Sequence, residues 1–253
     1  MKPSAGYTPP SVRTRKIPKQ VPMNTKIFCD IADISLIKKF NKRKIVKGFT
    51  TNPSLMRKAG AKDYKIYSQH ILRSTKKPVS FEVFADDEKN MILQGIKISQ
   101  LGRNVYVKVP VTNSKGKFMG RVIKHLNNKK IKLNITAVYT YKQTKQILKK
   151  INKKTKVIIS IFAGRMGDVG KDPIPEFKNS IELSKKFKNV EILWASTREP
   201  YNFLQAKNLK CHIITVPPLI IEKIEKFGKS FQKLTTETVK GFLADSKKSR
   251  FKI

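Results

Sequence analysis

The chain has 253 residues, of which 39% are hydrophobic, so it can bury a core and is not disordered throughout. Lys and Arg number 55 against 17 Asp and Glu, a formal net charge of +38, which raises a nucleic-acid hypothesis. No stretch approaches about 18 uncharged apolar residues, which argues against a membrane-spanning helix. With only Cys29, Cys211 and three histidines, a disulfide scaffold and a Cys/His zinc cluster are excluded. We expect a cytoplasmic protein without a secretory signal peptide, because the first thirty residues contain no apolar segment.

Residues 1–24 are rich in proline and basic side chains, and their only charged residues are Lys and Arg. This composition predicts an extended N-terminal arm outside the core. We expect residues 25–253 to form one domain.

Eight short apolar runs, rich in Val and Ile, alternate with segments of helical period. The expected strands are Lys26–Ile31, Ile45–Thr50, Val79–Phe84, Val105–Val111, Ile131–Val138, Val157–Phe162, Val190–Ser196 and Cys211–Val216. The expected helices are Ile34–Phe40, Ala61–Ser74, Glu88–Leu101, Met119–Asn127, Lys142–Ile151, Pro175–Lys186, Pro200–Leu209 and Pro218–Phe227, followed by an extra C-terminal helix, Ser230–Ser246.

Continuous apolar strands that alternate with helices indicate a parallel sheet covered by helices. Eight such units in about 200 residues predict a closed (β/α)8 TIM barrel with an extra C-terminal helix. The alternative is an open doubly wound sheet. That fold usually has a glycine-rich phosphate loop after its first strand, and residues 29–33 contain no glycine.

Polar residues interrupt or follow nearly every expected strand. In a barrel of this kind the active site lies at the C-terminal ends of the strands, so one polar residue per strand at that end favours a site over packing. These candidates are Asp30, Thr50, Asn52, Glu82, Lys108, Asn134, Thr136, Ser160, Arg165, Ser196 and Arg198.

Lys108 gives the sharpest signal, since it lies in an otherwise apolar strand. Alternation along the strand places Val107 and Val109 outside and Lys108 inside the barrel, together with Tyr106. Burial lowers the pKa of a lysine and makes it a nucleophilic amine suited to a Schiff base. The alternative is a lysine that extends from the strand end to solvent.

Each remaining charged candidate has a functional and a structural interpretation. Glu82, on the strand beside Lys108, could hold a water or shuttle a proton, or could merely form a salt bridge with Lys108. Asp30 could be an acid/base group or a cap for the following helix. Arg165 and Arg198, after neighbouring strands, suit one phosphate, although a single arginine in so basic a chain is often surface charge.

The high charge itself is interpreted as compositional. The excess is mostly lysine, spread along the chain in pairs such as residues 38–39, 76–77, 129–130, 149–150 and 185–186, and we expect most of these pairs on helix surfaces. Neither aromatic RNA-binding clusters nor a helix-turn-helix pattern occurs. We therefore expect no specific nucleic-acid partner; the alternative is a nucleic-acid-binding protein on a barrel scaffold.

Several motifs together resemble the transaldolase family, from roughly Lys26 to Phe227 and in the family's order. They are Gly48-Phe49-Thr50-Thr51-Asn52-Pro53-Ser54, Val107-Lys108-Val109-Pro110-Val111-Thr112, Leu133-Asn134-Ile135-Thr136, Ile159-Ser160-Ile161-Phe162-Ala163-Gly164-Arg165 and Trp194-Ala195-Ser196-Thr197-Arg198. The resemblance implies a class I aldolase-type barrel in which Lys108 forms a Schiff base with a ketose phosphate.

The resemblance also implies roles for the other candidates. Asp30 would assist carbon–carbon cleavage as acid/base, and Glu82 with Thr136 would hold the catalytic water. Substrate would be bound by the remaining set: Thr50, Asn52 and Asn134 around the dihydroxyacetone unit, Ser160 and Phe162 lining the site, and Arg165, Ser196 and Arg198 at the phosphate.

Small members of this family are transaldolases or fructose-6-phosphate aldolases. The aldolases typically have Gln where this chain has Glu82 and Tyr where it has Phe162, so the chain resembles a transaldolase of the pentose phosphate pathway. The alternative is an aldolase that releases free dihydroxyacetone. The implied substrates are fructose 6-phosphate, sedoheptulose 7-phosphate, erythrose 4-phosphate and glyceraldehyde 3-phosphate. No metal or organic cofactor is expected, and we expect a homo-oligomer with no membrane partner.

Overall fold

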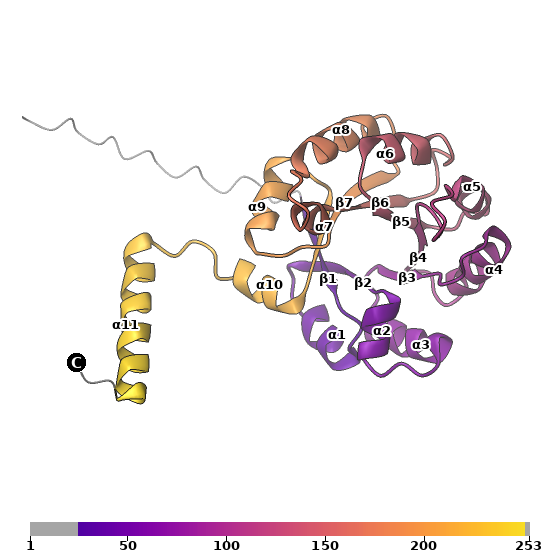
Figure 1. Cartoon of the computed structure of the whole chain (residues 1–253). Helices are drawn as coiled ribbons and strands as arrows, with labels where there is room; N and C mark the ends of the chain where they lie inside the picture. The colour runs from indigo at the N-terminus through magenta and orange to yellow at the C-terminus, as the bar shows by residue number, and fades with distance from the viewer. Residues whose placement is uncertain (1–24, 251–253) are drawn as a thin grey trace, which may run out of the picture.

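The fold is a closed barrel of eight parallel strands (Figure 1). The computed structural model describes residues 25–250, so the predicted N-terminal arm, residues 1–24, lies outside the described residues. The strands follow one another around the barrel in chain order, and the last pairs with the first, Ile27 with Ile214. The (β/α)8 prediction is confirmed, and the open-sheet alternative is wrong, because no strand is left as an edge of the barrel.

The strands lie within one or two residues of the predicted runs. They are β1 (Lys26–Asp30), β2 (Val46–Thr50), β3 (Val79–Glu82), β4 (Val105–Pro110), β5 (Leu133–Val138), β6 (Val157–Phe162), β7 (Val190–Ala195) and β8 (Ile213–Val216).

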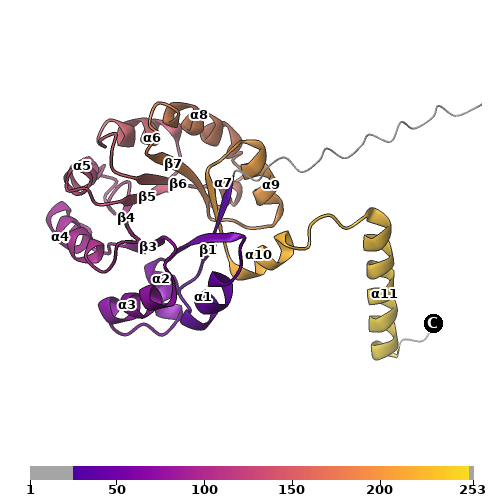
Figure 2. The ribbon, with the colours of Figure 1, turned by 180° about the vertical axis from the view of Figure 1, so that it is seen from behind.

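Helices surround the barrel and connect consecutive strands (Figures 1 and 2). They are α1 (Ile34–Asn41), α2 (Pro53–Lys58), α3 (Tyr64–Ser74), α4 (Glu88–Ser99), α5 (Gly120–Asn128), α6 (Tyr141–Leu148), α7 (Ala163–Gly167), α8 (Ile174–Ser184), α9 (Tyr201–Asn208), α10 (Pro218–Ile224) and α11 (Phe231–Ser249). Two of these helices, α2 and α7, are not among those predicted from the sequence. Both are six residues or shorter, and α7 follows β6 without a loop, so neither has a long periodic pattern of its own.

The core has two layers, as alternation along buried strands requires. A small cluster fills the barrel interior and includes Phe28, Tyr106, Ile158, Leu193 and Ile213. A much larger cluster packs between the sheet and the helices, with Val107 and Val109 fully buried in it. Tyr106 therefore faces inward and its neighbours in β4 face outward, as predicted.

The last helix, α11, lies apart from the barrel in both views (Figures 1 and 2). None of its residues is buried, and Phe231 and Phe242 are exposed. The predicted C-terminal helix is thus present, three residues longer than expected at its C-terminal end. Within residues 25–250, no helix is long and apolar enough to cross a membrane.

Candidate active site

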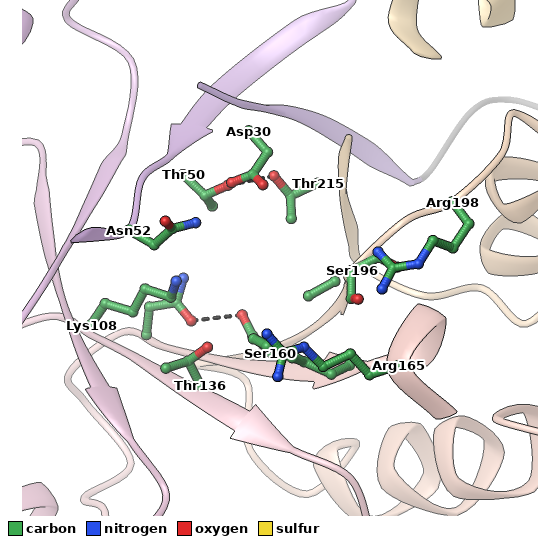
Figure 3. A pocket seen from close by; sticks show the side chains of 13 residues that line it. Asp30, Thr50, Asn52, Lys108, Thr136, Ser160, Arg165, Ser196, Arg198 and Thr215 are labelled. Atoms are coloured by element: carbon green, nitrogen blue, oxygen red, sulfur yellow. Dashed lines mark hydrogen bonds between the residues drawn. The ribbon is translucent and has the colours of Figure 1, made fainter. Parts of the chain in front are cut away.

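A polar pocket lies at the C-terminal ends of the strands. It is lined by Asp30, Thr50, Asn52, Lys108, Asn134, Thr136, Ser160, Phe162, Arg165, Ala195, Ser196, Arg198 and Thr215. Figure 3 shows that the carboxylate, the lysine and the two guanidinium groups approach it from different sides. The structure brings together eleven of the twelve predicted residues. The twelfth, Glu82, reaches the pocket only through Lys108.

Lys108 lies inside the barrel and does not extend to solvent. Its residue is 7% exposed, which rules out the alternative of a lysine reaching water from the strand end. The ammonium donates to the carbonyl oxygen of Thr51 at 3.2 Å. The amine of Lys108 thus lies at the floor of a polar pocket, and its position is fixed by a hydrogen bond to the residue that follows β2.

Glu82 pairs with Lys108 from the neighbouring strand. The two residues are register partners in β3 and β4, and Glu82 Oε2 lies 3.1 Å from Lys108 Nζ. The predicted salt bridge is therefore present. It does not exclude the predicted proton-transfer role, because the contact also places a carboxylate beside the one lysine among residues 25–250 that lines the pocket.

Asp30 is the second carboxylate of the site and ends a chain of hydroxyl groups. Thr50 Oγ1 donates to Asp30 Oδ1 at 2.6 Å, and the hydroxyls of Thr50 and Thr215 lie 2.5 Å apart. Since Thr50 has one proton and donates it to Asp30, Thr215 must donate to Thr50. Burial raises the pKa of Asp30, while the bond from Thr50 and the nearby charge of Lys108 act in the opposite direction.

The helix that follows β1 is capped by Asp33 and not by Asp30. Asp33 Oδ1 accepts from the backbone N–H of Leu36 at 2.8 Å. The capping alternative for Asp30 is therefore wrong, and its side chain is free for the pocket.

Asn52 both caps a helix and lines the pocket. Its Oδ1 caps α2 by accepting from the backbone N–H of Leu55 at 2.9 Å.

Amide and hydroxyl groups of three strands form the opposite wall. Ser160 Oγ donates to Asn134 Oδ1 at 2.7 Å, and Asn134 Nδ2 donates to Ser80 Oγ at 3.0 Å. These bonds fix the orientation of the Asn134 amide. The buried hydroxyl of Thr136 has no hydrogen-bond partner among residues 25–250. A buried hydroxyl without a partner at a polar pocket is suited to a water or a substrate oxygen.

Two arginines lie at the outer end of the pocket. Arg198 donates from Nε and Nη2 to the two carboxylate oxygens of Asp168, at 3.0 and 2.5 Å. This pairing lowers the pKa of Asp168. The guanidinium of Arg165 lies 5.8 Å from the ring centroid of Phe162. Both cations are exposed and line the same pocket, as the phosphate hypothesis requires.

A close backbone approach joins the two arginine-bearing segments. A Cβ on Gly164 would overlap the carbonyl oxygen of Ser196, so only glycine fits beside that residue. Ser196 itself has a φ of 62°, in the left-handed region. A strained backbone at a pocket residue is held by its surroundings and is common at functional sites. In this protein the close approach of Gly164 and Ser196 places the end of β7 against the start of α7.

Thr215 and Asp168 are not among the residues predicted from the sequence. Thr215 interrupts the apolar strand β8 in the same way as the predicted residues interrupt theirs, so the signal was present. Asp168 comes three residues after Arg165 in an irregular segment, and nothing in the sequence indicates that it pairs with Arg198.

The fold and pocket together define a barrel whose buried lysine has two acidic neighbours and whose mouth has two arginines. Within residues 25–250, no group of three or more His, Cys, Asp or Glu side chains could hold a metal ion. The donors suit an anionic, hydroxylated substrate near a nucleophilic amine. This is the arrangement of an enzyme of the aldolase or transferase type.

Comparison with known proteins agrees. The family model for transaldolase/fructose-6-phosphate aldolase matches residues 27–253. A protein of Nitrosopumilus maritimus named "Probable transaldolase" is 33% identical over 84% of this chain and 97% of its own length. One of the same name from Thermoanaerobacter is 29% identical over 90% of this chain and 100% of its own. The chain belongs to the transaldolase/fructose-6-phosphate aldolase family.

A solved structure supports the fold alone. The flavin-binding domain of baker's yeast flavocytochrome b2 has a TM-score of 0.53 with 13% identity, covering 76% of this chain and 56% of that chain. At this identity the likeness carries no information about the reaction.

Proposed function

We propose that the protein is a transaldolase that transfers a dihydroxyacetone unit from a ketose phosphate to an aldose phosphate through a Schiff base on Lys108. The observation that carries the proposal is the buried Lys108 ammonium between Glu82 and the pocket, with Asp30 in the same pocket. The donor would be fructose 6-phosphate or sedoheptulose 7-phosphate. The acceptor would be erythrose 4-phosphate or glyceraldehyde 3-phosphate.

The first stage is imine formation. The deprotonated amine of Lys108 adds to the C2 carbonyl of the ketose, and the carbinolamine loses water to give the protonated imine. Glu82, 3.1 Å from the nitrogen, is placed to accept and return the protons of these steps. The Thr136 hydroxyl, which has no hydrogen-bond partner within residues 25–250, is suited to hold the water that leaves.

The second stage is cleavage and transfer. Asp30 takes the proton of the C4 hydroxyl, the C3–C4 bond breaks, and its electron pair moves to the imine, leaving an enamine on Lys108. The aldose phosphate leaves and a second aldose phosphate enters. The enamine carbon then attacks the new aldehyde, and Asp30 returns its proton to the new hydroxyl. A carboxyl whose pKa is raised by burial is suited to accept and return a proton near neutral pH.

The pocket also offers groups for recognition. Asn134, fixed by Ser160 and Ser80, would hold hydroxyls of the dihydroxyacetone unit. Arg165, Arg198 and Ser196 would bind the phosphate by charge-assisted hydrogen bonds. To bind the phosphate, the Arg198 guanidinium would either release the Asp168 carboxylate or donate to both groups at once.

One assay tests the proposal: purified protein with fructose 6-phosphate, with and without erythrose 4-phosphate. The proposal expects sedoheptulose 7-phosphate and glyceraldehyde 3-phosphate when the acceptor is present, and little free dihydroxyacetone when it is absent. Release of dihydroxyacetone at full rate without acceptor would identify an aldolase instead. No turnover under either condition would contradict both.

A further inference from the structure

The two ends of the barrel differ in charge. The loops that run from a helix to the next strand gather at the end opposite the pocket. They are residues 42–45, 75–78, 100–104, 129–132, 149–156, 185–189 and 209–212. Together these loops contain 18 Lys or Arg and no Asp or Glu; taken in the same order, the loops have three, two, one, three, five, three and one of these cations. We call these seven loops the lysine face.

The loops at the pocket end do not share this excess. Residues 31–33, 51–52, 83–87, 111–119, 139–140, 168–173, 196–200 and 217 contain four Lys or Arg and six Asp or Glu. A purely compositional excess of lysine would enrich both ends. Moreover, four of the five lysine pairs, at residues 76–77, 129–130, 149–150 and 185–186, begin at the first or second residue after a helix and lie in the lysine face, so the expectation that most of these pairs lie on helix surfaces is wrong. The excess of Lys and Arg over Asp and Glu among the loops is therefore concentrated at the end of the barrel opposite the pocket.

Helix dipoles explain only part of the asymmetry. A cation near a helix C-terminus is favoured by about 0.3–1 kcal/mol, and this effect fades within one turn. It accounts for Lys149 and Lys185, which directly follow their helices. It does not account for Lys153, Lys154 and Lys156, which lie five or more residues beyond the end of α6.

The densest part of the lysine face is concave. One hollow is lined by Lys26, Lys153, Lys154, Lys156, Lys185 and Lys188, and an adjoining hollow shares Lys154 and Lys156 and adds Lys130 and Lys132. Lys26 pairs with Glu191 and Lys185 with Glu182. Within the described residues, Lys153, Lys154, Lys156 and Lys188 form no ion pair. The crowding lowers the pKa of Lys132, through burial and then through the charge of Lys156.

We propose that the lysine face binds the phosphodiester backbone of nucleic acid without reading its sequence. Lysine carries a compact point charge that suits phosphates, whereas arginine has the planar fork that favours bidentate contacts to base edges. Of the 18 cations, 16 are lysine. A membrane is disfavoured because none of the exposed large apolar side chains of residues 25–250 belongs to these loops. The face lies at the end of the barrel opposite the pocket, so the binding is separate from the proposed sugar chemistry.

The test compares two variants of the full chain that lose the same charge. Lys153→Gln/Lys154→Gln/Lys156→Gln/Lys188→Gln removes four exposed lysines of the face. Lys58→Gln/Lys89→Gln/Lys142→Gln/Lys178→Gln removes four exposed helical lysines elsewhere. The probe is a fluorescent 20-base-pair duplex DNA, titrated by anisotropy from about 50 to 200 mM NaCl. Thermal unfolding checks that both variants fold.

The proposal expects the first variant to bind about tenfold or more weakly at low salt. The slope of log Kd against log salt concentration should be smaller by about 3.6, the change expected from the loss of four phosphate contacts on duplex DNA. The helix variant should stay within about twofold of the wild type, and a second duplex of another sequence should bind equally. Equal losses in both variants, no binding by the wild type at about 50 mM NaCl, sequence-selective binding, or binding only to vesicles containing an anionic lipid would each overturn the proposal.

Discussion

Lys108 and Glu82 are register partners on neighbouring strands, and their charged atoms lie 3.1 Å apart. The amine that would carry the substrate therefore has a titratable carboxylate as its immediate neighbour. Phe162, across the pocket, packs toward Tyr139 at a ring distance of 6.0 Å and has no hydroxyl to offer. In the proposed mechanism, these two side chains would determine which groups other than an acceptor aldehyde can react with the enamine.

The first prediction concerns the partition between transfer and release. Glu82→Gln with Phe162→Tyr supplies a neutral group that holds water and a phenol that can donate a proton near the enamine. The ratio of dihydroxyacetone formed to fructose 6-phosphate consumed should rise in the double variant. The single variants show which group is responsible. An unchanged ratio in a variant that still turns over would mean that these positions do not control release.

The second prediction concerns the cost of burying Asp30. Its pKa is higher in the folded than in the unfolded protein, so the folded protein retains a proton that the unfolded chain has lost. The free energy of unfolding should therefore fall as pH rises above the ordinary aspartate pKa, by about 1.4 kcal/mol per unit of pKa difference. Asp30→Asn should remove this contribution and be more stable than wild type at pH 8, though inactive. Urea unfolding at pH 4, 6 and 8 measures the free energy of unfolding of the wild type and of Asp30→Asn. The same pH dependence in the two proteins would contradict a raised pKa of Asp30.

The third prediction separates Thr50 from Thr215. Thr50 donates directly to Asp30 and lowers its pKa, so Thr50→Val should raise that pKa further and move the acidic limb of the kcat/KM profile to higher pH. Thr215→Val leaves this bond in place and should shift the limb less, in the same direction, because it removes only the donor to Thr50. A merely structural role would lower the rate without moving the limb.

The fourth prediction concerns phosphate. Loss of one charge-assisted contact costs about 1.5–3 kcal/mol, so Arg198→Ala should raise KM for fructose 6-phosphate roughly tenfold or more. Unphosphorylated dihydroxyacetone should be affected far less. Arg121→Ala, at an 86% exposed side chain outside the pocket, is the matched control. Equal losses for the two substrates would reject Arg198 as a phosphate ligand.

Most of this architecture could be predicted because burial leaves a strong pattern in the sequence. Strands such as β6 are apolar without interruption except at Ser160, so one polar residue marks both the strand and the pocket. The same rule applied to Thr215 would have found it. The Asp168–Arg198 pair could not be predicted, because it joins two irregular segments 30 residues apart through a close approach that only Gly164 permits. The charge difference between the two ends of the barrel could not be predicted from the sequence either, because it depends on which loops lie at the same end.

The most direct test of the central claim is covalent trapping on Lys108. The protein is incubated with fructose 6-phosphate and borohydride, digested, and analysed by mass spectrometry. The account predicts loss of activity and a dihydroxyacetone-derived mass on the peptide that contains Lys108. Lys108→Arg keeps the positive charge but cannot serve as the amine nucleophile at neutral pH, so it should show no turnover and no adduct. An adduct on another lysine, or full activity in Lys108→Arg, would contradict the account.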